Sequence, residues 1–231
     1  PEFRGAMHYC VFNGGKRIRP ALVYLSAAAC DVDPSKADLP AAAIELIHAY
    51  SLVHDDLQDR DTLRRGKNAV WVEFGDELAI TLGDWLINQA YDVMLQIDGP
   101  AKTTRAVARA MAKAVAETVR GQAIENEAKT SLTTSRTDYI DMATGKTAPL
   151  LALPLEAVCM LANRTAQECA AIRSALECLG GAYQLRDDLI DLLGQKGRGC
   201  AGADLIEGKA TLPVLIYHGA ATEQDQQALE A

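Results

Sequence analysis

The sequence contains two clusters of aspartates with one spacing, DDxxD. Their carboxylates belong to Asp55, Asp56 and Asp59 in the first cluster and to Asp187, Asp188 and Asp191 in the second. Carboxylates this close repel one another unless a cation lies between them. Both clusters have apolar neighbours, which predicts burial, and a buried carboxylate needs a cation or becomes neutral. A single cluster would more often be a solvated helix face, but two of them favour a cation site.

Oxygen ligands of this kind suit a hard cation, Mg²⁺ above all. Mg²⁺ keeps several waters and takes one or two protein carboxylates together with phosphate oxygens of a substrate. The clusters therefore predict a phosphorylated substrate that metal bridges to the protein. Arg64 and Arg65 follow the first cluster, and guanidinium groups pair well with phosphate oxygens. Taken alone, the two arginines would also fit a surface turn.

The segment GGKRIRP, residues 14–20, is a further candidate for binding anions. Its glycines permit close backbone approach, and Lys16, Arg17 and Arg19 follow them. The GxxxxGK[ST] spacing of a P-loop is absent. The segment therefore indicates a small anion site and not a P-loop.

Three more residues could contribute to such a site. Lys146 in ATGKTAPLL and Lys209 in EGKATLP each precede an apolar run. Each is weak evidence alone, because Gly-Lys pairs are common in exposed turns, but with the aspartates they supply cations for a polyanionic ligand. His48 lies on the helical stripe of Leu52 and Asp55. A hydrogen-bonded core histidine is an equally good interpretation of His48.

Composition sets broad limits on the class of protein. The chain has 231 residues, 49% of them hydrophobic and 23% charged, which is typical of a soluble globular domain. The net charge of −8 argues against general binding of nucleic acid. The six cysteines form no CxxC pair, so we expect mostly buried thiols in a reducing compartment, with neither a zinc site nor a disulfide framework. The most apolar stretch, residues 148–162, is too short to span a bilayer. No signal peptide is visible, and a cytoplasmic protein is expected.

Helical periodicity dominates the chain, and convincing strand patterns are missing. We predict one all-α domain over residues 1–231. Helices are expected at residues 21–30, 40–60, 76–96, 102–127, 136–162, 166–194 and 210–220. Pro40 suits the first turn of its helix, with Asp38 as a cap. The run VWVEF, residues 70–74, alternates like a strand but has no partner. Each DDxxD cluster presents a carboxylate stripe, and two such helices can face each other across a bundle core.

The segments together resemble the trans-isoprenyl diphosphate synthases, the head-to-tail polyprenyl synthetases that include farnesyl and geranylgeranyl diphosphate synthases. The resemblance covers residues 5–217. It is carried, in the family's order, by GGKRIRP, ELIHAYSLVHDDLQDRDTLRRG, GKTAPLL, QLRDDLIDLLG and DLIEGKATLP. Any one segment would be unspecific, but the combination is highly specific.

The resemblance implies a helical bundle around a deep central cavity, usually in a homodimer. It implies three Mg²⁺ ions on the allylic diphosphate, held by Asp55, Asp56, Asp59, Asp187 and Asp191. Asp188 belongs to the same catalytic set. Positions that match contacts to the allylic substrate are Arg64, Lys146, Thr147, Gln184 and Lys209. Positions that match contacts to the diphosphate of isopentenyl diphosphate are Lys16, Arg19, His48 and Arg65.

The implied reaction begins with ionisation of the allylic diphosphate, continues with attack by the isopentenyl double bond and ends with loss of a proton. An apolar cavity would keep water from the carbocation. In the family, a bulky residue five positions before the first motif floors the cavity. Tyr50, with Ser51 beside it, therefore favours a short product, C15 first and C20 second.

Three features depart from the family pattern. Bacterial farnesyl synthases often carry two extra residues in the first motif, and this chain lacks them, which loosens the C15 assignment. Cys200 stands where the family usually has a loop lysine, for which Lys196 or Arg198 could substitute. The family also has a helix before residue 5 and more helices after residue 231, so terminal helices are expected to be missing at both ends.

Other interpretations remain open at this point. A terpene cyclase shares the first motif but has no second diphosphate substrate, which GGKRIRP and the second motif argue against. Head-to-head synthases of the squalene type fail on the same segments. A non-catalytic regulatory subunit is a different class, but such subunits tend to lose one motif. A longer-chain polyprenyl diphosphate synthase is the remaining alternative.

Overall fold

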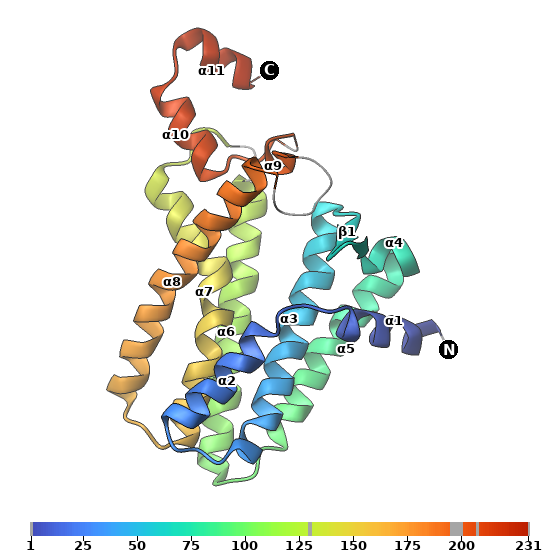
Figure 1. The fold of residues 1–231 in the computed structure, drawn as a ribbon, viewed down its shortest axis with the longest axis vertical. Helices are drawn as coiled ribbons and strands as arrows, with labels where there is room; N and C mark the ends of the chain where they lie inside the picture. The colour runs from blue at the N-terminus through green and yellow to red at the C-terminus, as the bar shows by residue number, and fades with distance from the viewer. Residues whose placement is uncertain (1, 129–130, 195–200, 207, 231) are drawn as a thin grey trace. The chain divides into compact units, whose positions relative to one another are not determined.

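A computed structural model describes residues 2–128, 131–194, 201–206 and 208–230 (Figure 1). In this part of the chain, the only strands are the paired two-residue strands β1 (Leu63–Arg64) and β2 (Lys67–Asn68). The α-helices are α1 (Glu2–Phe12), α2 (Ile18–Ala29), α3 (Asp38–Asp59), α4 (Val70–Phe74), α5 (Asp76–Leu95), α6 (Ala101–Ala128), α7 (Arg136–Leu161), α8 (Ala166–Leu192), α9 (Ala203–Ile206), α10 (Leu212–Ala220) and α11 (Glu223–Glu230), with a 3-10 turn η1 (Pro34–Lys36). The predicted all-α class is confirmed.

The seven predicted helices are present as α2, α3, α5, α6, α7, α8 and α10, each with ends within a few residues of the prediction. The sequence did not predict α1, η1, α9 or α11. The run VWVEF is helix α4, which buries Val70 and ends at Gly75, where φ is 87°. Asp38 is not a cap: α3 has no side-chain cap, and Asp38 instead accepts a hydrogen bond from the Tyr24 hydroxyl at 2.7 Å.

The chain forms two compact units. The first comprises Pro1–Val115 and Leu150–Ser174, and the second comprises Ala116–Pro149 and Ala175–Ala231. The divisions fall within α6, α7 and α8. The first DDxxD motif lies in the first unit, at the end of α3, and the second motif lies in the second unit, at the end of α8.

In the first unit, α3 and α5 lie side by side (Figure 1). Ile44 and Ile47 of α3 and Leu82 and Leu86 of α5 are fully buried. A Cβ atom at Gly83 would lie 2.0 Å from His54 Nε2, so only glycine allows this approach of α5 to α3. The close packing fixes the helix that carries the first motif.

In the second unit, a small core of Tyr139, Met142, Ala143, Ala210 and Leu215 surrounds the base of α7. Helix α8 approaches α7 closely, since a Cβ atom at Gly180 would lie 2.6 Å from the Ala148 Cβ atom. Small residues on both helices therefore bring the start of the second motif against α7.

None of the described cysteines forms a disulfide. Cys159 is buried, Cys10, Cys30 and Cys169 are half-buried, and Cys178 is exposed. Cys200, with Lys196 and Arg198, lies outside the described residues.

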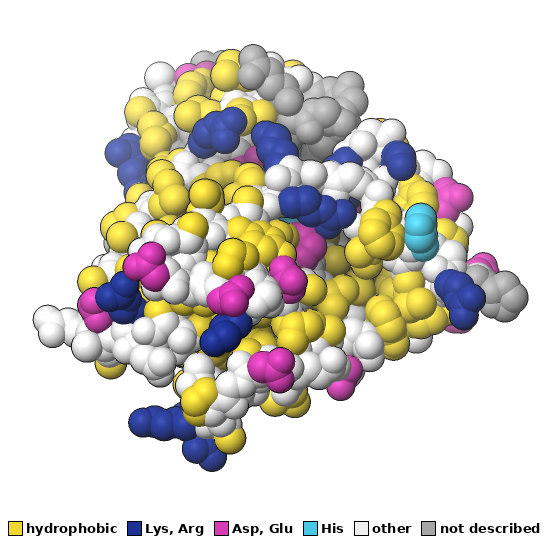
Figure 2. Space-filling model, turned by 60° about the horizontal axis from the view of Figure 1, so that its bottom comes forward, with side chains coloured by type: hydrophobic (Ala, Val, Ile, Leu, Met, Phe, Trp, Pro, Cys, Tyr) yellow, Lys and Arg dark blue, Asp and Glu magenta, His cyan; other side chains and the backbone are white. Residues whose placement is uncertain are grey.

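Basic, acidic and hydrophobic side chains are interspersed on the face shown in Figure 2. This mixture accords with the net charge of −8. Among the described helices, none combines the length and the apolar character that crossing a membrane requires.

Candidate active site

A pocket lies in the first unit, between α1, α3 and the β1–β2 hairpin. Its walls bring together residues from segments far apart in the sequence. They are Cys10, Asn13, Arg17, Glu45, His48, Ala49, Leu52, Val53, Asp56, Arg64, Arg65, Asn68 and Val70. The GGKRIRP segment, the first aspartate motif and the double arginine thus converge on one pocket.

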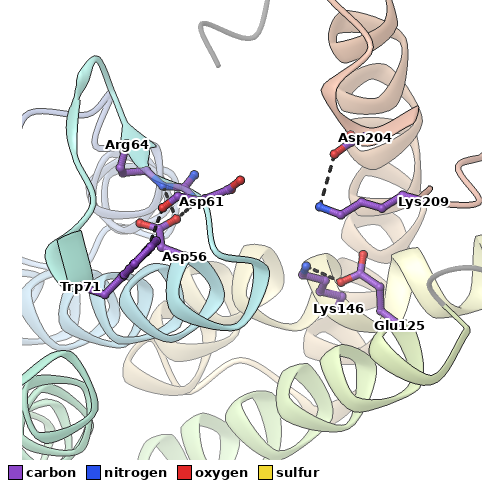
Figure 3. Close-up of polar contacts among 8 residues, drawn as sticks. All are labelled: Asp56, Asp61, Arg64, Trp71, Glu125, Lys146, Asp204 and Lys209. Carbon is purple, nitrogen blue, oxygen red and sulfur yellow. Dashed lines mark hydrogen bonds and ion pairs between the residues drawn. The ribbon is translucent and has the colours of Figure 1, made fainter. Parts of the chain in front are cut away.

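Asp56 and Arg64 form the charged centre of this pocket (Figure 3). Asp56 is only 3% exposed, and Arg64 Nε donates to Asp56 Oδ1 at 2.8 Å. Arg64 also pairs with Asp61 at 3.7 Å. Burial raises the pKa of Asp56 to about 6, against the opposing effect of Arg64. The prediction that buried carboxylates have a cationic partner is met here by a guanidinium group.

The turn after α3 brings Arg64 back over the motif. Arg60 adopts a left-handed conformation, with φ 56°, and ends the helix. The Asp61 amide then donates to the Asp56 carbonyl at 2.9 Å, and Trp71 Nε1 donates to the Asp61 carbonyl at 2.8 Å. These hydrogen bonds hold the short turn in place and so position strand β1, which carries Arg64.

Arg65 and Arg17 join the hairpin and the GGKRIRP loop. Arg65 Nη1 donates to the Gly14 carbonyl at 2.6 Å. A Cβ atom at Gly15 would lie 2.6 Å from the Arg65 guanidinium group, and the φ of 105° at Gly15 favours glycine at this position. Arg17 pairs with Glu45 and donates to the Val11 carbonyl at 2.5 Å. The arginines therefore shape the pocket as well as charging it.

His48 and Asn13 have polar atoms without a hydrogen bond in the pocket wall. His48 Nδ1 and Asn13 Oδ1 are buried and have no hydrogen-bond partner. Burial, with the nearby Arg19, Arg65, Arg64 and Arg17, lowers the pKa of His48 to about 2, so the imidazole is neutral. Native structures rarely leave buried polar atoms unpaired, which marks this wall as a place for a ligand.

Several residues predicted from the sequence lie outside the pocket walls. Lys16 is exposed in the loop before α2, and Arg19 Nε donates to the Leu150 carbonyl at 3.2 Å. Tyr50 stacks edge-on against His54, with ring centroids 4.9 Å apart. Ser51 Oγ donates to the His48 carbonyl at 2.9 Å. Asp55 and Asp59 are half-buried on α3 beside Asp56.

The second motif has a hydrogen-bonded network of its own in the second unit. Asp188 is 3% exposed and accepts from Tyr139 Oη at 2.5 Å and from Gln184 Nε2 at 3.2 Å. Thr147 Oγ1 donates to Gln184 Oε1 at 3.2 Å. The structure thus brings Thr147 and Gln184, both predicted from the sequence, against the second motif.

Two lysines of this unit form ion pairs (Figure 3). Lys146 Nζ lies 2.5 Å from Glu125 Oε2, and Lys209 Nζ lies 3.4 Å from Asp204 Oδ1. The Asp204 amide donates to Asp191 Oδ2 at 2.9 Å. Asp191 is 2% exposed, and its Oδ1 atom has no hydrogen-bond partner.

Comparison with known proteins identifies this combination of segments. The family model described as Polyprenyl synthetase matches residues 1–231. The chain belongs to the polyprenyl synthetase family. The resemblance inferred from the two motifs is therefore confirmed.

Two curated relatives and one solved structure show what this polyprenyl synthetase is similar to. A short chain isoprenyl diphosphate synthase of Methanothermobacter thermautotrophicus is 35% identical over 227 residues, 97% of this chain and 69% of the relative. A (2E,6E)-farnesyl diphosphate synthase of Mycobacterium bovis is 38% identical over 212 residues, 90% of this chain. The geranylgeranyl pyrophosphate synthetase of Pyrococcus horikoshii has a TM-score of 0.91 at 34% identity, covering 99% of this chain and 70% of that chain. The chain spans only 58% of the length of the mycobacterial relative.

Prenyl synthases of this family generally use a divalent metal ion. The residues present fit such an ion, because both motifs offer carboxylate oxygens and the buried Asp191 Oδ1 accepts no hydrogen bond. Within the described ranges, three acidic, histidine or cysteine side chains do not converge as a ready-made ligand set.

Sequence reasoning missed several residues that shape the site. Asn13, Glu45 and Asp61 are polar residues beside recognised motifs, and their proximity was a usable signal. Trp71 and Tyr139 had none, because their partners Asp61 and Asp188 lie on other elements.

Proposed function

We propose that this polyprenyl synthetase catalyses the head-to-tail condensation of isopentenyl diphosphate with an allylic diphosphate. The product is a short-chain prenyl diphosphate, C15 or C20, and diphosphate is released. The observation that carries the proposal is the pocket in which neutral His48, Asn13 and Arg65 lie beside the Asp56–Arg64 pair. The farnesyl and geranylgeranyl synthases among its relatives support the same reaction class.

The pocket of the first unit is proposed to bind the diphosphate of isopentenyl diphosphate. Arg65 would supply charge, and the unpaired His48 Nδ1 would gain a polar partner from the ligand or an ordered water. Lys16 precedes α2, and Arg19 is the second residue of that helix. Both are close in sequence to Arg17, which lines the pocket. A neutral imidazole suits this position, since a protonated one would add a fifth cation beside four arginines at a high desolvation cost.

The allylic diphosphate is proposed to bind at the aspartate motifs. Asp55, Asp56, Asp59, Asp187 and Asp191 would hold three Mg²⁺ ions. Bound Mg²⁺ would neutralise the negative charge that develops as diphosphate leaves. Arg64, Lys146 and Lys209 add cationic charge for the same oxygens, and Thr147 and Gln184 orient them.

After ionisation, the isopentenyl double bond attacks the allylic carbon and forms the new carbon–carbon bond. The departed diphosphate then takes the proton that is lost. Holding both substrates by their diphosphates brings the reacting carbons together.

The proposal is tested by incubating the protein with Mg²⁺, radiolabelled isopentenyl diphosphate and each allylic starter in turn. A discrete C15 or C20 alcohol after dephosphorylation, abolished by a chelator, is the expected result. A ladder of longer alcohols would favour a long-chain polyprenyl synthase. Folded protein that forms no product alone but raises the turnover of a partner synthase would favour a regulatory subunit.

Product length is proposed to depend on Tyr50, with Ser51 beside it. Tyr50 is half-buried. Its ring packs against His54 and against the buried cluster that contains Leu82 and Leu86. Tyr50→Ala should remove this bulk and lengthen the product by at least one C5 unit. An unchanged product from Tyr50→Ala would rule out Tyr50 as the floor of the cavity.

A homodimer in the cytoplasm is proposed from the resemblance and the composition. Light scattering of the purified protein would measure its mass in solution. A mass of one chain at micromolar concentration would overturn the dimer, and fractionation of the source cells would test the location.

A further inference from the structure

Tyr139 of α7 forms a hydrogen bond with the second aspartate motif, and no motif in the sequence predicts this contact. Its side chain is 6% exposed, and its hydroxyl donates to Asp188 Oδ2 at 2.5 Å, across 49 residues of sequence. The backbone amide of Leu212, the first residue of α10, hydrogen-bonds to the same phenol oxygen. One hydroxyl therefore joins α7, α8 and α10.

Both carboxylate oxygens of Asp188 are engaged by neutral donors. Oδ2 accepts from Tyr139, and Oδ1 accepts from Gln184, one helical turn earlier on α8. Thr147 of α7 holds Gln184 in turn. Asp188 is thus anchored to α7 by two routes, and a carboxylate so committed has little room to coordinate a metal ion as well.

The two other aspartates of the motif are placed differently. Asp187 is half-buried, and Asp191 keeps a buried Oδ1 atom without a hydrogen bond while its Oδ2 atom accepts from the Asp204 amide. Successive residues of a helix point about 100° apart. Fixing Asp188 against α7 therefore fixes the rotation of α8 about its axis, and with it the directions of Asp187 and Asp191.

We infer that Tyr139 is a positioning residue of the second aspartate motif, which acts through Asp188 to aim Asp187 and Asp191 at the metal–diphosphate complex. This inference rests on the proposed function, because it assumes that the motif binds metal and diphosphate. Tyr139 itself touches neither. Its role differs from that of a packing residue in one respect: the hydroxyl matters, and not only the ring.

Replacing Tyr139 by phenylalanine keeps the ring and removes the donor. Asp188 Oδ2 then loses the hydrogen bond from Tyr139 in a buried position, which favours a turn of the Asp188 side chain. This turn releases the rotation of α8. We expect the binding of Mn²⁺ with inorganic diphosphate to weaken roughly tenfold, while the KM for isopentenyl diphosphate stays within about twofold of wild type.

Tyr24→Phe is the matched control. Tyr24 also donates to a carboxylate, Asp38 Oδ1 at 2.7 Å, but it is 42% exposed and lies in the first unit. Its hydroxyl should be dispensable for binding. Calorimetric titration of the whole chain with Mn²⁺ and inorganic diphosphate measures wild type and both variants under the same conditions.

A double-mutant cycle keeps the inference falsifiable if Tyr139→Phe folds poorly. Asp188→Asn removes the charge that accepts the Tyr139 hydrogen bond, so Asp188→Asn and the double variant test the same coupling without a buried carboxylate. If Tyr139 acts through Asp188, the double variant binds no more weakly than the weaker single variant. Asp187→Asn, which removes a proposed ligand, should weaken binding much more than Tyr139→Phe.

Three results would overturn the inference. One is Tyr139→Phe binding as tightly as wild type, which leaves the proposed function intact. Another is additive losses from Tyr139→Phe and Asp188→Asn, which would make the two residues independent. The last is wild-type protein that binds no Mn²⁺–diphosphate, which overturns the proposed function together with the inference.

Discussion

The two DDxxD motifs have one spacing but are held in two different ways. In the first unit, Asp56 is paired with the guanidinium group of Arg64, in a pocket that also contains Arg17 and Arg65. In the second unit, Asp188 is held by the neutral donors of Tyr139 and Gln184. The contact described for Asp56 is a charged one, whereas those described for Asp188 are hydrogen bonds from neutral groups.

This difference shows what the spacing determines and what it leaves free. The DDxxD pattern places carboxylates on one face of a helix. It does not specify how the buried middle aspartate is stabilised, because that depends on residues from other elements. A charged anchor makes the first site sensitive to loss of the cation, whereas a neutral anchor makes the second site sensitive to single hydroxyl groups.

Removal of the charged anchor should have the largest effect. Arg64→Gln leaves Asp56 and Asp61 buried without their guanidinium partner, so the pKa of Asp56 rises further and the carboxyl is protonated near neutral pH. We expect turnover to fall roughly 10²–10³-fold at pH 7. Arg64→Lys should recover only part of it, since lysine lacks the fork geometry. Turnover of Arg64→Gln within threefold of wild type would contradict a charged anchor.

The isopentenyl diphosphate site should respond next. Arg65→Gln removes a charge-assisted contact and the hydrogen bond to the Gly14 carbonyl. The KM for isopentenyl diphosphate should rise roughly 10–100-fold, with the KM for the allylic substrate much less affected. Steady-state kinetics with each substrate varied in turn measures both constants. Equal rises in the two constants would mean that Arg65 does not discriminate between the substrates.

His48 gives the first unit a pH signature. The folded pKa of His48 is about 2, below its ordinary value of 6.5, so the unfolded chain takes up a proton below about pH 6.5 and the folded chain does not. The stabilising contribution is complete above about pH 6.5 and declines as the pH falls toward 2. Between pH 6.5 and 5, wild type should lose about 1–2 kcal/mol more of its unfolding free energy than His48→Gln.

Urea unfolding at the two pH values checks this difference. The raised pKa of Asp56 acts in the opposite direction, but Asp56 is present in both proteins and its effect largely cancels. Parallel pH profiles for wild type and His48→Gln would show that His48 is accessible to protons in the folded chain.

The smallest effect should come from the hydrogen bond between Thr147 and Gln184, which supports Asp188 only through Gln184. Thr147→Val keeps the shape of the side chain and removes the hydroxyl that donates to Gln184 Oε1. We expect about a fivefold rise in the KM for the allylic substrate, in line with one lost hydrogen bond. Thr147→Ser, which keeps the hydroxyl, is the control and should behave as wild type. A larger loss than that of Arg64→Gln would reverse the comparison between the two anchors.

Much of the fold was predictable because it depends on local signals. Helical periodicity and the Gly, Pro and Asp turns located the seven long helices. The run VWVEF was ambiguous because four apolar residues and one glutamate fit either a strand or one helical turn, and its contacts with α5 decide for the helix. Helix α1 was missed although its apolar residues recur at helical spacing and pack in one cluster: Phe3, Ala6, Met7, Cys10 and Val11.

The site was predictable where single motifs carry it and hidden where tertiary contacts do. Asp56 and His48 belong to a recognisable helix, and the hairpin arginines follow it directly. By contrast, Tyr139 meets Asp188 only because α7 and α8 approach closely at Ala148 and Gly180. One sequence does not reveal that approach, so the neutral anchor was missed.

Because Gly83 has no Cβ atom, this position has a consequence for how product length could evolve. His54 occupies the space where a Cβ atom would be, and Tyr50 stacks on His54. A single methyl group at position 83 would therefore displace the imidazole on which the ring proposed to set product length stacks. Lineages could then retune the length of their isoprenoids through a substitution on α5, and libraries that diversify only the residues before the first motif would not include it.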